Sequence, residues 1–208
     1  MGCQASQPIY PMGVDPRLMT YGSNNSKTVD SKSFKIPLTE REVFNITKSW
    51  KAISKNMTNT GVNMFLKMFE TNEDMKIMFE QFRTVDNVAD LWTSRALENH
   101  AVLVMNALDD AITNMDDEQY VVEMLLTTGK SHRRFENFNA NIFWNIEEPF
   151  LISIKETLGN RMNSNLEQVY AKAIRFVLII LVTGFEQKEV KSVSGMSTPS
   201  NMSSAFSR

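Results

Sequence analysis

Apolar residues recur every three or four positions through much of residues 37–187, and this period predicts amphipathic α-helices. The first predicted helix begins at residues 39–42 (TERE), where the threonine and the second glutamate have the spacing of a capping box. Its apolar stripe consists of Val43, Ile46, Trp50, Ile53 and Met57. We interpret Gly61 as the join to a second helix and Asn72 as the cap of a short third one.

Two further helices are predicted in the middle of the chain, and each carries a histidine on its apolar side. Ser94 is expected to begin the first of them. Its inner face consists of Leu97, His100, Val104, Leu108 and Ala111. Asp116, with Gln119 three positions later, is expected to begin the second. One side of that helix carries Leu125, Thr128 and His132.

The last part of the domain predicts two more helices. Residues 141–158 read as one helix that ends at Gly159 and is kinked or interrupted by Pro149, which lacks a backbone donor. Residues 164–167 (SNLE) have capping-box spacing and open a long final helix. Its inward positions are Val169, Ala173, Phe176, Val177, Ile180 and Leu181. The predicted fold class is therefore all-α, with six to eight helices.

The ends of the chain differ in composition from this helical part. Residues 1–36 are rich in Ser, Asn, Pro and Gly and predict a flexible extension. Residues 188–208 are rich in Ser and predict a disordered tail. A single domain, residues 37–187, lies between them. The longest aliphatic run, residues 176–182, is shorter than the roughly 20 residues that a membrane span needs.

Charge and cysteine content narrow the classes of function. The net charge of −2 gives no reason to expect nucleic acid as a partner. One cysteine among 208 residues excludes an intramolecular disulfide framework, which fits a reducing compartment.

The two histidines admit two interpretations. Each can be a buried core histidine with a local hydrogen bond, or the two can bind a metal between their helices, because a buried imidazole needs a partner. Two histidines without nearby cysteines do not make a four-ligand structural zinc site. A planar tetrapyrrole supplies four ligands itself and needs one or two axial residues and an apolar slot.

The segments FETNEDMKIMFEQFR, TSRALENHAVLVM and LLTTGKSHRRF resemble the globins, and more narrowly the globin X group and its N-acylated invertebrate relatives. The resemblance covers about residues 38–187 and implies a globin fold around haem b. It implies that His132 is the proximal iron ligand and His100 the distal one, available as a sixth ligand. It also implies a pocket formed by Phe79, Phe82, Val104, Thr128 and Phe138.

This sequence departs from the globin pattern at several positions. Thr128, one turn before His132, occupies a position where leucine is usual. Leu103 is apolar where many globins offer a polar or basic group to the haem propionates. Three arginines are candidates for that role instead: Arg83, Arg95 and Arg133. We expect the second ring nitrogen of His132 to donate to a backbone carbonyl or a hydroxyl on its own helix.

Three functions are considered as hypotheses, two of them implied by the resemblance. The first is a bis-histidyl globin that acts in redox chemistry or gas signalling at a membrane, with an unknown electron donor or acceptor. The second is an O₂-binding globin for storage, transport or sensing. The third is a non-haem, lipid-anchored helical adaptor. Enzymatic reduction of nitrite or peroxide stays open, and no catalytic residue is assigned.

The first six residues, MGCQAS, match the M-G-x-x-x-[ST] pattern for N-myristoylation at Gly2. One myristoyl chain binds membranes only marginally, so stable anchoring requires a second signal. A palmitoyl group on Cys3, the single cysteine, would supply it. We therefore expect the protein at the cytoplasmic face of a cellular membrane, most simply the plasma membrane.

Overall fold

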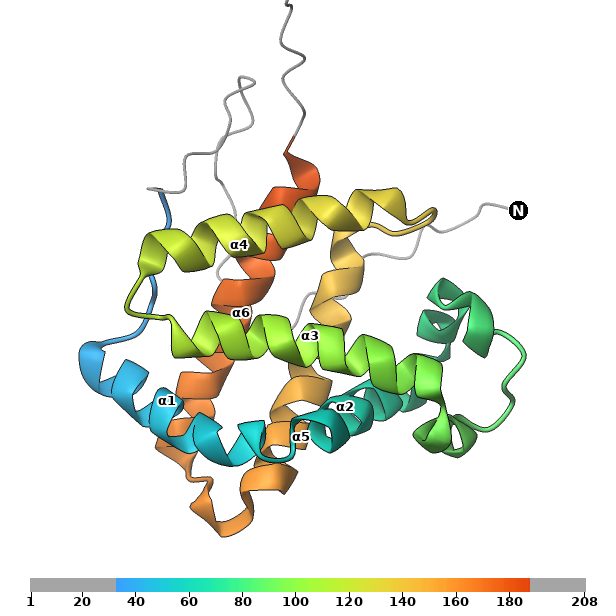
Figure 1. The fold of residues 1–208 in the computed structure, drawn as a ribbon, viewed down its shortest axis with the longest axis horizontal. Helices are drawn as coiled ribbons and strands as arrows, with labels where there is room; N and C mark the ends of the chain where they lie inside the picture. Colours follow the sequence, from blue (N-terminus) through green and yellow to red (C-terminus); the bar gives the residue numbers. More distant parts are fainter. Residues whose placement is uncertain (1–32, 188–208) are drawn as a thin grey trace, which may run out of the picture. The chain divides into compact units, whose positions relative to one another are not determined.

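The computed structural model describes residues 33–187, and every regular element in that part of the chain is helical (Figure 1). The α-helices are α1 Glu40–Ser54, α2 Met57–Thr71, α3 Arg95–Thr113, α4 Glu118–Ser131, α5 Glu147–Leu158 and α6 Ser164–Glu186. Short 3-10 helices connect them: η3 Glu73–Met78, η4 Glu80–Phe82, η5 Val88–Thr93, η6 His132–Arg134, η7 Ala140–Ile146 and η8 Gly159–Arg161. The all-α prediction is confirmed. The predicted tail, and all but the end of the predicted extension, lie outside the described residues.

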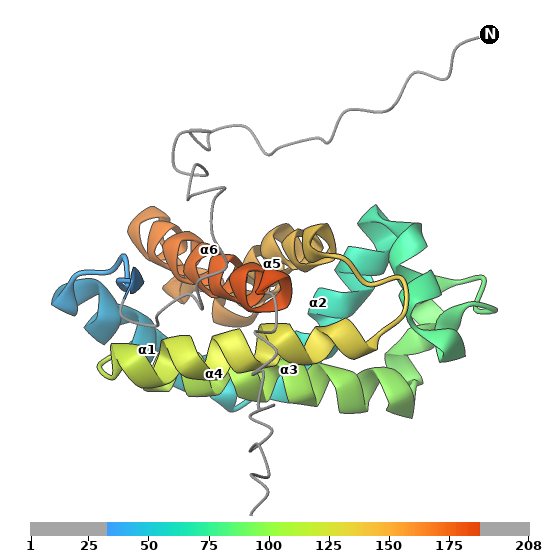
Figure 2. The same ribbon diagram turned by 90° about the horizontal axis from the view of Figure 1, so that it is seen from above.

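The helices pack in two main groups around one core. α4 lies against α6, and α2 packs against both α3 and α5. Figures 1 and 2 show α3 and α4 running alongside each other, joined by the short turn between them. The largest buried side chains on the α1 side are Trp50, Phe150 and Tyr170, whose rings pack together 6.3 to 6.4 Å apart. The Trp50 indole donates to Asp109 on α3, which fixes α1 against that helix.

α6 is the longest helix, and by length and composition it could cross a membrane. Half of its apolar window is buried inside the domain, mainly against α4. Its buried residues include most of the predicted inward set, namely Val169, Ala173, Phe176, Val177 and Ile180, while Leu181 is half-buried. Burial of this kind is typical of a core helix.

Two of the predicted helix starts are confirmed, and two are wrong by one residue. Thr39 and Glu42 form the predicted capping box, and the Ser94 side chain accepts the Leu97 N–H. α4 is capped by Asp117 instead of Asp116, and α6 by Asn163 instead of Ser164. In both cases the neighbouring residue also has a capping side chain, so the local pattern fits either position.

Gly61 does not join two helices but lies inside α2. The join is at Asn56, the residue before α2. A Cβ on Gly61 would lie 2.6 Å from Cγ of Met105, so the glycine allows α3 to approach α2 closely. Asn72 precedes η3 as predicted, but its side chain makes no cap and instead donates to Asn145.

The predicted helix over residues 141–158 is instead two elements, η7 and α5. Pro149 lies in the first turn of α5, where backbone N–H groups have no partner within the helix, so the proline is accommodated without a kink. Gly159 ends α5 as predicted. Its φ of 52° is a left-handed conformation, which glycine adopts at little cost.

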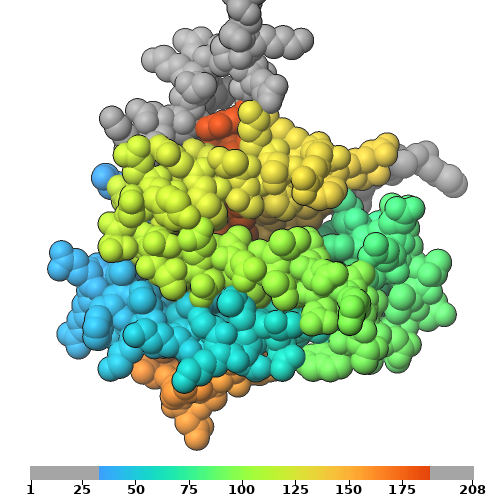
Figure 3. All heavy atoms as spheres, in the orientation of Figure 1, coloured from blue at the N-terminus to red at the C-terminus, as the bar shows by residue number. Residues whose placement is uncertain are grey.

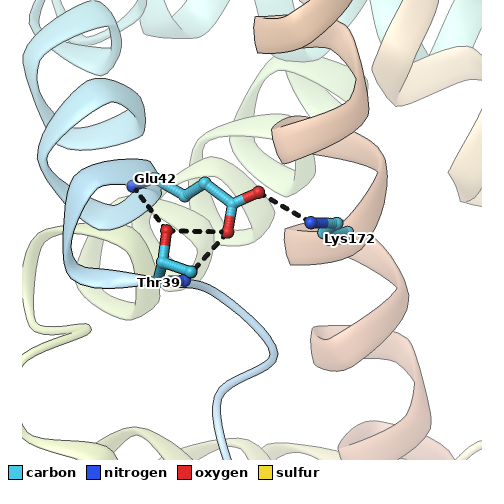
Figure 4. A network of polar contacts seen from close by, with 3 residues as sticks. All are labelled: Thr39, Glu42 and Lys172. Carbon is cyan, nitrogen blue, oxygen red and sulfur yellow. Dashed lines mark hydrogen bonds and ion pairs between the residues drawn. The ribbon is translucent and has the colours of Figure 1, made fainter.

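A polar network ties the start of α1 to α6 (Figure 4). One carboxylate oxygen of Glu42 accepts from the backbone and the side chain of Thr39, and the other lies 2.6 Å from Nζ of Lys172. These contacts lower the pKa of Glu42 from 4.5 to about 2, the lysine being the largest cause. The capping carboxylate is therefore charged through most of the acid range.

We predict that Lys172→Met raises the pKa of Glu42 toward its ordinary value, because the largest stabilising partner of the carboxylate is removed. A depressed carboxyl pKa stabilises the fold at pH values above 4.5, and this contribution disappears as the pH falls through 2. The variant should therefore be less stable than the native chain at neutral pH. The two proteins should be equally stable once the pH is low enough to protonate Glu42 in both. Carboxyl NMR titration measures the pKa directly. An unchanged value would show that Lys172 does not act on Glu42.

Candidate functional site

The two histidines of the chain lie on adjacent antiparallel helices. His100 is in the second turn of α3, and His132 follows the last residue of α4 and begins η6. His100 precedes Thr113, the last residue of α3, by 13 residues, and His132 follows Glu118, the first residue of α4, by 14 residues. Helices rise about 1.5 Å per residue, so similar lengths on either side of the turn bring both histidines to similar heights. Both imidazoles are partly buried.

The imidazole of His132 is held by its own helix. Its Nδ1 lies 2.8 Å from the backbone carbonyl oxygen of Thr128, which only accepts, so Nδ1 carries the proton. This confirms the prediction that one ring nitrogen donates within the helix. The same carbonyl accepts from the Ser131 hydroxyl, whereas the Thr128 hydroxyl donates to the carbonyl of Met124. Nε2 of His132 is left as the nitrogen with a free lone pair.

Aromatic rings surround His132. Its ring centroid lies 5.1 Å from that of Phe138, 4.9 Å from that of Phe143 and 6.0 Å from that of Phe135. Phe138 and Phe143 also pack on Phe185 near the end of α6. The structure therefore places Phe138 beside His132, as predicted, and adds ring contacts from η7 and α6. These walls are apolar, and the imidazole is half-buried among them.

Two phenyl rings flank His100. The ring centroids of Phe65 and Phe79 each lie 5.0 Å from that of the imidazole. Phe79 in turn stacks on Phe82, with 5.2 Å between centroids, and Phe82 is buried. Within residues 33–187 no hydrogen bond restrains the His100 ring. The imidazole is therefore positioned by packing alone, in contrast to His132.

Both imidazoles are neutral at pH 7. The pKa of His100 is lowered to about 4, mainly by burial and further by the charge that His132 can carry. The pKa of His132 is also lowered, mainly by burial; the hydrogen bond to Thr128 opposes this effect, and the charge of Arg134 adds to it. Neutral imidazole is the form that binds metals.

The remaining predicted pocket residues lie in this region, with different degrees of contact. Val104 is half-buried on α3, one turn after His100 and on the same face of the helix. Thr128 contributes through its backbone carbonyl, and its hydroxyl is turned away from His132. Phe82 reaches His100 only through Phe79. The predicted lipidation positions Gly2 and Cys3 lie outside the described residues.

Sequence reasoning missed the two phenylalanines that touch the imidazoles from other helices. Phe65 belongs to the predicted second helix and Phe143 to the predicted helix over residues 141–158. The α-helical period assigns both to the general core. Phe143 instead lies in the 3-10 helix η7, and its ring packs against His132.

The three arginines considered as propionate partners have different surroundings. Arg133 donates to the backbone carbonyls of Gly184, Phe185 and Gln187, so it closes the C-terminal end of α6. Arg83 donates to the carbonyl of Ile77. Arg95 is exposed in the first turn of α3. Arg133 is therefore committed to the fold.

The side chains present fit a planar metal cofactor that supplies its own equatorial ligands. Two neutral imidazoles come from facing helices, one with its coordinating nitrogen selected by a backbone carbonyl. The walls are aromatic and aliphatic. No group of three or more metal-binding side chains occurs in the described part of the chain, so a metal bound by protein ligands alone is not supported there.

Comparisons with known proteins agree with this geometry. A family model described as Globin matches residues 62–180. Neuroglobin of Dissostichus mawsoni is 26% identical over 148 residues, which are 71% of this chain and 92% of that protein. Cytoglobin-1 of Oryzias latipes is 31% identical over 96 residues, 46% of this chain and 54% of that protein. A crystal structure of a hexacoordinated haem protein from an anhydrobiotic tardigrade has a TM-score of 0.69 and 27% identity, covering 72% of this chain and 96% of that one.

Proposed function

This chain belongs to the globin family, since the family model spans more than half of it, and we propose that it is a bis-histidyl haem protein in which His132 and His100 are the axial ligands. Its cofactor is haem, which supplies an iron that changes oxidation state and binds O₂ and other diatomic gases. The observation that carries the proposal is the pair of neutral imidazoles on facing helices, one of them held by Thr128. The solved tardigrade structure with a similar fold is described as hexacoordinated.

His132 is the proximal ligand in this proposal. The Thr128 carbonyl keeps the proton on Nδ1, so Nε2 would be the nitrogen available to bind the haem iron, in a single tautomer. Phe138 and Phe143 hold the plane of the ring and keep water out. The chain's own contribution on this side is a fixed, neutral and well-oriented donor.

His100 is the sixth ligand and also the gate. Phe65 and Phe79 confine its ring, yet no hydrogen bond within the described residues ties it to one position. An imidazole held only by packing is able to swing aside at a small cost. External gases then bind only to the open fraction, so their apparent affinity is reduced by that fraction.

We predict that His100→Leu abolishes the six-coordinate absorption bands of the ferrous protein and raises its apparent affinity for carbon monoxide. If about 1–10% of the native protein is open, the affinity rises about tenfold to a hundredfold. Absorption spectra without added ligand and carbon monoxide titrations measure both effects. Native protein that shows five-coordinate bands without added ligand would contradict the assignment of His100. Slow oxidation and reversible O₂ binding by the native protein would instead favour O₂ storage, transport or sensing.

The proposed setting is the cytoplasmic face of the plasma membrane, as in the N-acylated globin X relatives that the sequence resembles. The supporting residues are Gly2 in the myristoylation pattern and the neighbouring Cys3. An anchored haem protein with two histidine ligands keeps similar coordination in both oxidation states, which suits electron transfer or redox signalling. Bulk delivery of O₂ gains nothing from such an anchor.

We predict that Gly2→Ala moves a fluorescent fusion from cell membranes to the cytosol, because without the myristoyl chain Cys3 is not held near the palmitoylating membrane. Cys3→Ser should give an intermediate distribution, since one acyl chain binds marginally and reversibly. Fractionation and imaging provide the measurement. If Gly2→Ala leaves the distribution unchanged, the anchor is not myristoyl.

A further inference from the structure

The outer side of α1 carries basic residues and an exposed aromatic ring on a single face. Its members, which we call the basic face, are Arg41, Phe44, Lys48, Lys51 and Lys55. They are spaced 3, 4, 3 and 4 residues apart, so they fall on one side of the helix. The buried residues of α1, including Ile46 and Trp50, lie on the opposite side. All five members are exposed, and Phe44 is 64% exposed.

The cations of the basic face have no acidic partners in the described part of the chain. Five other basic residues there do form ion pairs: Lys35, Lys67, Lys155, Lys172 and Arg175. On α1 itself, Glu42 is turned toward Lys172 on α6 (Figure 4), and Glu40 lies at the margin of the face in the first turn. The four cations of the face are therefore not neutralised within the fold.

Phe44 distinguishes this face from an ordinary solvated charge cluster. Nζ of Lys48 lies 5.8 Å from the centre of its ring, so the ring is flanked by charge and not covered by apolar side chains. An exposed aromatic among basic residues matches the interface of a bilayer, where the ring enters the headgroup layer and the ammonium groups contact anionic lipids. In Figures 1 and 3, α1 forms an edge of the helical domain, where a flat surface can reach it.

We propose that the basic face of α1 docks on membrane leaflets that contain anionic phospholipids. This inference rests on the proposed membrane setting and adds the surface that orients the domain there. Glu40 follows Gly2 by 38 residues, and a chain of that length extends more than about 100 Å at full stretch. A connection of that length does not set the orientation of the domain at the bilayer. The basic face sets that orientation, because its positive charge complements the anionic lipids.

The test uses full-length, haem-loaded Gly2→Ala protein, so that acyl chains do not contribute. Cosedimentation with vesicles of phosphatidylcholine mixed with phosphatidylserine should show binding that weakens strongly as salt is raised, and vesicles of phosphatidylcholine alone should bind little. Lys48→Glu should weaken binding at least about fivefold, since each basic residue near an anionic surface contributes about that factor. Phe44→Ala should weaken binding several-fold.

Arg161→Glu is the matched control, because it makes a comparable change of charge at an exposed residue of η8, outside α1 and the haem site. It should leave vesicle binding nearly unchanged. Circular dichroism and the haem spectrum show whether each variant is folded. If Lys48→Glu does not fold, Lys51→Glu is measured in its place. Equal binding to both vesicle types, or equal losses in the α1 variants and Arg161→Glu, would overturn the proposal.

Two further outcomes distinguish lipid docking from binding of other acidic partners and from anchoring by acyl chains. Retention of duplex DNA or of an acidic protein, without vesicle binding at the same ionic strength, would overturn the lipid assignment and identify another occupant. Unchanged cellular distribution of the Gly2→Ala fusion would refute the acyl anchor. Vesicle binding is measured on an unacylated chain, so it stands or falls separately from the anchor.

Discussion

His132→Ala is expected to lose most of its haem. The side chain provides the donor that the fold orients best, since the Thr128 carbonyl fixes its tautomer and two phenyl rings fix its plane. Removing a residue that merely orients a metal ligand weakens metal binding about tenfold to a hundredfold, so removal of the ligand itself should exceed a hundredfold. The haem-to-protein ratio after purification and the rate of haem transfer to a competing acceptor protein measure the effect.

The matched variant is His100→Ala, which should retain haem close to the native ratio. His100 has no hydrogen bond to orient it in the described part of the chain, so it contributes less to holding the cofactor. Added imidazole offers a second comparison. It should restore haem binding to His132→Ala, because the Thr128 carbonyl and the surrounding rings remain to hold it. Equal haem loss in both alanine variants would show that the two histidines share the role of anchor.

The positions of the two histidines were predictable because helix period and helix starts determine them. The apolar stripe around His100 sets its face on α3, and the starts of α3 and α4 set the length of the hairpin between the two histidines. The cap of α4 is Asp117 and not the expected Asp116, but this difference of one residue does not change which residues share a face of α4. The acceptor for the Nδ1 proton of His132 was predictable as a class, because a histidine on a helix reaches the carbonyl four residues earlier.

Contacts between distant segments were not predictable from local pattern. Phe65 touches His100 only because α2 packs beside α3, and Phe143 touches His132 only because η7 packs on α6, which itself lies against α4. From the sequence, Arg133 is a candidate partner of a haem propionate. In the structure it donates to the carbonyls of Gly184 and Phe185 at the end of α6. These residues are about 50 positions away in the sequence, so only the folded domain brings them beside Arg133. The unpaired cations on α1 follow from the fold, in which Glu42 is turned toward Lys172 on α6.

The close contact between α4 and α6 was likewise not predictable from the local sequence pattern. It leads to a prediction about stability. Gly129 and Gly184 lie inside these helices, where glycine is intrinsically unfavourable by about 1 kcal/mol relative to alanine. In the structure the two helices approach so closely that a Cβ on Gly129 would overlap the carbonyl oxygen of Leu181 and lie 2.8 Å from its carbonyl carbon. A Cβ on Gly184 would overlap the carbonyl oxygen of Leu126 in the same way.

We predict that Gly129→Ala lowers the free energy of unfolding by about 3 kcal/mol or more, despite the better helix propensity of alanine. The obstacle is backbone, which cannot rotate aside, so α4 must move away from α6. Gly61→Ala is the graded control: its Cβ would lie 2.6 Å from Cγ of the Met105 side chain and 3.2 Å from Cβ and the carbonyl oxygen of Ala101, a milder overlap, so the loss should be smaller, about 1–2 kcal/mol. Urea unfolding of the haem-free chains compares the three proteins, and a native-like Gly129→Ala would show that the helices do not touch there.

The same substitution should also speed the loss of haem. Gly129 precedes His132 by three residues, and Phe185, next to Gly184, packs on Phe138 beside the imidazole. A shift of α4 away from α6 therefore opens the aromatic wall on the proximal side while leaving His132 and its bond to Thr128 in place. Haem dissociation from Gly129→Ala should be faster than from Gly61→Ala when both are measured under conditions where each chain is fully folded. Equal rates would mean that the α4–α6 contact supports the fold but does not shape the haem site.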